Sequence, residues 1–207
     1  MLTYVTLTAV DYWRNPCGYS GHMATIPDTL SNEMWALLSC ANAALEEAEV
    51  PVGKAFVNPG LTVPDDECCA GQLAVRVVER YPSRSFPAID ATSSNCNPSF
   101  WAVQLGVSVL RCAHVIDDDM NAPTAEEMTA DAFAMNRDAS LLETAIRCCW
   151  VPRGTEKKMI QQWVPRETEG GCMGGEWLVY YAQGSCSCPD EHPVALPPYD
   201  RPEPSVY

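Results

Sequence analysis

The sequence has no uninterrupted apolar run of about 18 residues, which is the length that a membrane-spanning helix requires. Its first residues, MLTYVTLTAVDYWRNP, lack the basic start and the long apolar stretch of a signal peptide. We therefore expect no membrane partner and synthesis in a reducing cytoplasm.

Basic residues are scarce: 13 Lys and Arg stand against 27 Asp and Glu, for a formal net charge of −14. A main function as a phosphate-binding groove is disfavoured, because nucleic acid is held chiefly by neutralising its phosphates. The acid is spread along the chain, so the folded body itself must be acidic. With 47% hydrophobic residues, the composition is that of a globular protein rather than a disordered one.

Catalytic signatures are also missing. There is no phosphate-binding loop, no HExxH pair and no dinucleotide fingerprint. The segment GYSGH at 18–22 places a serine beside a histidine, but without the spacing of a nucleophile elbow. We predict no enzyme activity, no catalytic residues and no cofactor; a Cys- or zinc-dependent enzyme centred on His114 is the minor alternative.

One acidic loop resembles a calcium-binding pattern at Asp117, Asp119 and Asn121. Ala122 and Met128 stand where that pattern needs glycine and a bidentate glutamate. The loop is therefore interpreted as a solvated acidic turn before a helix, where negative charge favours the helix N-terminus. We predict no metal site.

The eleven cysteines form no Cys-x-x-Cys pair, and Cys186, Cys188 and His192 make only half of a zinc site. The chain is long enough to build a core without disulfides, so we expect it to fold with reduced thiols, any disulfides being late additions. Connectivity does not follow from the sequence. The candidates for a disulfide or thiol cluster are Cys68, Cys69, Cys96, Cys148, Cys149 and Cys172.

Hydrophobic periodicity predicts two helices. Residues 30–49 carry one apolar stripe, made of Met34, Leu37, Leu38, Ala41, Leu45 and Ala48. Residues 125–149 follow a capping box at Thr124–Glu127. The stripe expected to face the core in this second helix is Met128, Ala132, Met135, Ala139, Leu142 and Ile146, with Asp131, Asp138 and Glu143 away from it.

Alternating patterns predict four strands, over residues 72–81, 100–112, 156–166 and 176–183. Glycines between the last two favour a hairpin, and Pro165 places its strand at an edge or bulge. Residues 51–71 are interpreted as a linker. The inner face of the second strand is expected to be Trp101, Val103, Leu105, Val107 and Val109.

These elements predict an α+β fold, a four-stranded, mainly antiparallel sheet with two helices packed on one face. The predicted organisation is an extended N-terminal arm at 1–27, the α+β domain at 28–185 and a Pro-rich C-terminal tail at 186–207. Both arms are aromatic yet lack an internal packing pattern. The candidate interface residues are Tyr12, Trp13 and Tyr199 in the arms and Trp163 and Arg166 in the third strand.

Four segments carry a family resemblance: ALEEAEVPVGKAFVNPG, CCAGQLAVRVVERYPSRSFP, the stretch from FWAVQLGVSVLRC to LLETAIRCC, and GGCMGGEWLVYY. They resemble neck proteins of long-tailed phages that infect actinobacteria, and the element order over residues 30–185 is most similar to the tail terminator. The resemblance implies a virion protein, assembled in the host cytoplasm, whose subunits form a six-fold ring.

The implied partners are further copies of the chain, the tail tube protein on one face of the ring and a head-to-tail stopper or adaptor on the other. DNA would cross the lumen without specific binding. The alternatives are another neck component, either the stopper or a tail completion protein, and a disulfide-stabilised binding domain. A stopper is expected to be mostly β.

Overall fold

The computed structural model describes residues 29–64, 68–89, 100–116, 120–152 and 157–184. These residues form an α+β fold, as predicted. In chain order, its elements are α1 (Thr29–Glu47), β1 (Lys54–Asn58), a 3-10 turn η1 (Cys68–Ala70), β2 (Gln72–Ser83), β3 (Phe100–Cys112), α2 (Ala125–Thr144), a π-helical turn η2 (Ala145–Cys149), β4 (Lys158–Glu169) and β5 (Cys172–Gly184).

The sheet is mixed and has five strands in the order β1-β2-β3-β5-β4. Strand β1 runs parallel to β2, and every other pair is antiparallel. The prediction of four strands is wrong because β1 lies in the segment 51–71, which was interpreted as a linker. Its five residues are held by backbone pairing to β2, from Lys54 opposite Gln72 to Asn58 opposite Arg76, and so short a strand carries too little alternation to stand out within a Pro- and Gly-rich segment.

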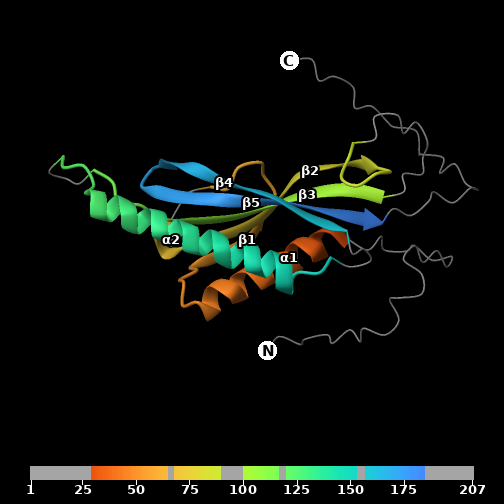
Figure 1. Cartoon of the computed structure of the whole chain (residues 1–207), viewed down its shortest axis with the longest axis horizontal. Helices are drawn as coiled ribbons and strands as arrows, with labels where there is room; N and C mark the ends of the chain where they lie inside the picture. The colour runs from red at the N-terminus through yellow and green to blue at the C-terminus, as the bar shows by residue number, and fades with distance from the viewer. Residues whose placement is uncertain (1–28, 65–67, 90–99, 117–119, 153–156, 185–207) are drawn as a thin grey trace, which may run out of the picture.

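Both helices lie on the same side of the sheet, as Figure 1 shows, and they contact each other. The whole predicted stripe of α1 enters the core, and Leu37, Ala41 and Leu45 are fully buried. The principal core cluster joins the helices to the inner sheet face; it consists of Met34, Leu37, Leu38, Ala41, Leu45, Val50, Leu73, Val75, Val103, Leu105, Val107, Val109, Leu142, Ile146, Trp150, Val179 and Tyr181.

Helix α2 is rotated relative to the prediction. Leu142 and Ile146 are buried as expected, but Met128 is 56% exposed. Asp138, predicted to lie away from the core, is fully buried and forms an ion pair with Arg111 of β3. A buried guanidinium requires an opposite charge, and this requirement turns the Asp138 face of the helix toward the sheet.

The predicted hairpin of β4 and β5 is confirmed. Gly170 and Gly171, with φ of 58° and 79°, make a tight turn in a backbone region that glycine adopts most readily. Pro165 lies on β4, an edge strand, as predicted. No helix among the described residues is long and apolar enough to cross a membrane.

Candidate functional site

The two edges of the sheet are β1 and β4, and neither has a second strand partner among the described residues. Of the candidate interface residues, Trp163 and Arg166 lie on β4, and the structure places them on the same edge. Tyr12, Trp13 and Tyr199 lie outside the described residues.

Trp163 is half-buried and packs on its own sheet. Its ring centroid lies 5.9 Å from that of Trp177 on β5. It also lies over Gly175, where a Cβ atom would overlap the indole ring. Trp163 therefore closes the core at the β4 edge, and its contact with a neighbouring subunit stays a prediction.

Arg166 contacts the segment that follows β1, the strand at the opposite edge of the sheet. Its Nη1 donates a hydrogen bond to the carbonyl of Val63, at 3.2 Å. Val63 belongs to the segment between β1 and β2, so this bond ties that segment to the opposite edge strand. The side chain remains half-buried, and its role in an interface likewise stays a prediction.

The segment between β1 and η1 covers part of the sheet face that the helices leave open. Strand alternation places Ala74 and Leu110 on that face, next to Leu73 and Val109 on the helix side. A second, smaller apolar cluster forms there; it consists of Val63, Cys68, Ala74, Leu110 and Cys172, with Phe56 packed against it.

Four cysteines pin this cover to the sheet, in an arrangement that we call the cysteine clasp. Cys112 of β3 and Cys172 of β5 are cross-strand partners. The consecutive residues Cys68 and Cys69 bond one to each: Cys68 to Cys172 and Cys69 to Cys112. The first disulfide is buried and the second lies at the surface.

A third disulfide joins Cys40 of α1 to Cys149 at the end of η2. Cys148 is an exposed free thiol, and Cys96 lies outside the described residues. Sequence reasoning missed Cys40 and Cys112. For Cys112, the one signal was its position at the end of a predicted strand, because its pairing depends on a strand register that spacing does not reveal. The Cys40–Cys149 bond depends on the packing of α1 against η2, which spacing does not reveal either.

A polar network occupies the centre of the open sheet face. Arg76 of β2 donates two hydrogen bonds to Glu176 of β5, at 2.7 and 2.6 Å, and Ser108 of β3 donates to the same carboxylate at 2.8 Å. The Arg76 and Glu176 side chains are only 14% and 12% exposed. The network ties three strands together across Gly106, and nothing in the sequence pattern predicted it.

Two further polar contacts extend this network toward the other end of the strands. The hydroxyl of Tyr180 donates a hydrogen bond to Glu79. Burial raises the pKa of this hydroxyl far above its ordinary value of 10.0, and the hydrogen bond to Glu79 raises it further. Gln104 donates to Gln161 of β4 at 2.7 Å. A sheet face with this many paired polar groups is suited to water or to a polar partner rather than to a second helix layer.

Lys158 caps the C-terminal end of the helical segment. Its Nζ donates to the carbonyls of Ile146 and Trp150, both at 2.6 Å, and of Arg147 at 3.1 Å. Burial lowers the pKa of Lys158 below its ordinary value of 10.5. These bonds satisfy carbonyls that a helix end leaves without partners, and they fix the start of edge strand β4 against the helix layer.

His114 pairs with a carboxylate rather than with a cysteine. Its Nδ1 lies 2.8 Å from Asp131 Oδ1, and its backbone N–H donates to Asp131 Oδ2 at 2.9 Å. This pair joins the end of β3 to α2. Within the described ranges, no group of three or more His, Cys, Asp or Glu side chains is placed to hold a metal ion.

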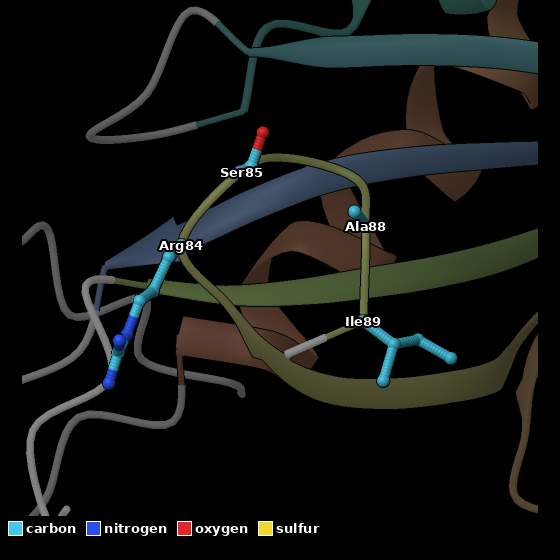
Figure 2. A pocket seen from close by; sticks show the side chains of 4 residues that line it. All are labelled: Arg84, Ser85, Ala88 and Ile89. Carbon is cyan, nitrogen blue, oxygen red and sulfur yellow. The ribbon is translucent and has the colours of Figure 1, made fainter. Parts of the chain in front are cut away.

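A small hollow lies at the turn after β2, lined by Arg84, Ser85, Ala88 and Ile89. Figure 2 shows that the Arg84 guanidinium points away from the other three side chains. The turn is fixed by hydrogen bonds from Ser83 to the Ala88 carbonyl and from Tyr81 to the Pro87 carbonyl. Among the described residues that line the hollow, no charged groups converge, so these residues do not form the polar centre of a catalytic pocket.

The chain matches no protein-family model, and no match to a curated protein was found.

Proposed function

We propose that this chain is a structural virion protein, the tail terminator of a long-tailed phage, six copies of which form a ring at the end of the tail tube. One face of the ring contacts the tube protein and stops its polymerisation. The other face receives the head-side stopper or adaptor, and DNA passes through the lumen.

The observation that carries the proposal is that the two sheet edges, β1 and β4, lie on opposite sides of the sheet and have no second strand partner in the described parts of the chain. A contact between one edge of a subunit and the opposite edge of the next is head-to-tail, and such a contact closes into a ring when the rotation fits. Apolar side chains are available at both edges: Met159 and Val164 on β4 are 36% and 37% exposed, and Leu61, which follows β1, is 75% exposed.

The edges also carry features that oppose unlimited strand pairing. All three lysines of the chain lie at the starts of the edge strands: Lys54 begins β1, Lys158 begins β4 and Lys157 precedes it. Strand β4 also contains Pro165 and two register shifts. Edge lysines, prolines and bulges discourage continuous backbone pairing between two edge strands. The proposed ring contact is therefore made by edge side chains such as Leu61 and Val164 rather than by an extended sheet.

The acidic character of the chain supports a lumen that DNA crosses without binding. At a net charge of −14, a subunit repels phosphate rather than retaining it. The long helix α2 supports the terminator over the stopper, since a stopper is expected to be mostly β.

A second candidate is a disulfide-stabilised binding domain, which the three disulfides favour. Such a domain would bind its ligand as a single copy, without forming a ring on a tail tube. The two candidates therefore predict different outcomes when the chain is mixed with tail tubes: the terminator forms a ring at the tube end, and the binding domain does not.

The experiment uses particles assembled without this chain. Under the proposal, their tails are overlong and headless, and adding the purified protein during assembly restores uniform length and head joining. Leu61→Glu and Val164→Glu should each abolish this rescue, because each places a charge at one edge contact. Ile89→Glu is the matched control, since Ile89 is 66% exposed but lies outside both edge strands. Tails of unchanged length after addition of the parent protein would refute the proposal.

A further inference from the structure

One side of helix α2 faces outward and carries a row of exposed residues, which we call the stripe. At 100° per residue, Glu126, Ala130, Phe133 and Arg137 fall on one side of the helix, opposite the side that Asp138 and Leu142 bury. All four are exposed, and Phe133 is 69% exposed. The flanking exposed positions are small or uncharged; they are Thr129, Ala132, Asn136 and Ser140.

This stripe is unusual for so acidic a chain. Between Glu126 and Arg137 its exposed positions carry no charge, although the whole chain has a net charge of −14. An aromatic ring stands at its centre, and the exposed Met128 lies beside it. Large exposed apolar side chains on a charge-poor helix face are typical of a surface that contacts another protein.

The order of residues along the stripe is self-complementary. In an antiparallel pairing of two α2 helices about a two-fold axis, the register that places Glu126 opposite Arg137 also places Ala130 opposite Phe133. Two-fold symmetry repeats each contact. Such a pair would therefore hold two Glu–Arg contacts at its ends and two Phe–Ala contacts at its centre.

We infer that a second copy of this chain occupies the stripe, with its α2 antiparallel to the first. The small side chain of Ala130 leaves room for the Phe133 ring of the partner. The guanidinium of Arg137 is available, since its side chain is 53% exposed and its contact with Asp138 is long, at 3.4 Å. Charge complementarity favours a second copy as the partner. Two chains that each carry a net charge of −14 repel each other over most of their surfaces, whereas this face brings Glu126 of one copy to Arg137 of the other.

The dimer is distinct from the proposed ring. A two-fold contact cannot generate a head-to-tail ring, and the stripe lies on the helix layer rather than on β1 or β4. Pairing through α2 therefore leaves both sheet edges available, and it is the state of the free chain before assembly. The dimer and the ring can be tested separately.

The test is the mass of the full-length chain in solution by sedimentation equilibrium over a range of micromolar concentrations. We expect a monomer–dimer equilibrium for the parent. Phe133→Glu should be monomeric at every concentration. The control is Trp35→Glu, which changes an aromatic residue that is 60% exposed on α1 and should leave the dimer intact.

Charge reversal tests the register. Glu126→Arg or Arg137→Glu alone should weaken the dimer roughly tenfold, because each change disrupts two symmetry-related charge pairs. The double variant carrying both changes should regain the parent's dissociation constant. Circular dichroism confirms that each variant is folded, which is expected because all of these positions are exposed.

Three results would overturn the inference. A parent that is monomeric throughout would show that another part of the chain, or nothing, covers the stripe. An equal loss of dimer in Trp35→Glu would place the contact elsewhere. A double variant no better than either single variant would contradict the antiparallel register.

Discussion

Cys112 and Cys172 lie opposite each other on β3 and β5, and each is bonded to one of two consecutive cysteines, Cys69 and Cys68. Two crosslinks from one short turn to two neighbouring strands fix the position and the rotation of that turn. The segment that covers part of the open sheet face is thus attached at η1, while Arg166 holds it from β4. The segment between β1 and η1 is therefore fixed to the sheet at both of these points.

The clasp should stabilise the domain without being needed to form it. The principal core lies on the other sheet face, so the reduced chain should still fold. Replacing Cys68 and Cys172 with serine should lower the free energy of unfolding by about 2–5 kcal/mol, because the lost bond closes a loop with a sequence separation of 104. Unfolding of the parent and of the variant, both without reductant, measures this loss, and thermal unfolding of the parent with reductant tests whether the reduced chain still folds.

The control for that experiment is Cys148→Ser, which removes the exposed free thiol and should leave the melting temperature unchanged. Peptide mapping of the oxidised protein should recover Cys68 with Cys172 and Cys69 with Cys112. The crossed pairs would contradict the clasp, and complete loss of structure on reduction would contradict the claim that the core alone suffices.

Leu105 is the most direct test of the sheet-and-helix core. It is fully buried on β3, within the cluster that faces both helices. Leu105→Asp places an uncompensated charge there and should cost more than about 4 kcal/mol, enough to unfold the domain. Ile116→Asp, at a site that is 58% exposed, should melt like the parent. A Leu105→Asp protein with a native melting curve would refute this core.

Gly106 has a role that only its lack of a side chain permits. A Cβ at this position would overlap the carboxylate of Glu176, which lies across the strand to reach Arg76 and Ser108. Gly106→Ala should displace that carboxylate and destabilise the fold by about 3 kcal/mol. Gly184→Ala is the control, since a Cβ at that position would meet no atom within 4 Å beyond its chain neighbours. Equal stability of the two variants in urea would contradict the network.

The capping box of α2 should give a defined pH dependence. Glu127 accepts a hydrogen bond from the Thr124 backbone N–H at 2.8 Å, and this bond, with the Thr124 hydroxyl, holds the pKa of Glu127 below its ordinary value of 4.5. A lowered carboxyl pKa means that the stabilisation is present above 4.5 and is lost as the pH falls through the folded-state value.

Comparison with Glu127→Gln isolates this contribution. The parent should be the more stable protein at neutral pH, and the difference in free energy of unfolding should shrink as the pH falls below 4.5 and the Glu127 carboxylate is protonated. Urea titrations at several pH values measure it. A difference that stays constant across the range would show that the carboxylate charge does not stabilise the helix N-terminus.

Local patterns predicted the elements whose signal lies within their own residues. The α1 stripe, the alternation of β3, the Thr124–Glu127 capping box and the glycine turn at Gly170 all match the structure. Each depends on side-chain period or on turn chemistry, and neither requires knowledge of a distant partner.

The features that were missed depend on distant partners. Strand β1 exists because β2 offers it a parallel edge, and α2 is rotated because Asp138 pairs with Arg111, 27 residues away along the chain. The clasp depends on the register of β3 with β5. The same limit applies to the polar network, in which Arg76 and Glu176 are 100 residues apart.

Image averages of tail-tube ends incubated with the purified chain test the central claim most directly. The account predicts a ring of six copies at the end of each tube, and no further growth of a capped tube when more tube protein is added. Tube ends that stay bare and continue to grow, with the chain remaining in solution, would contradict it.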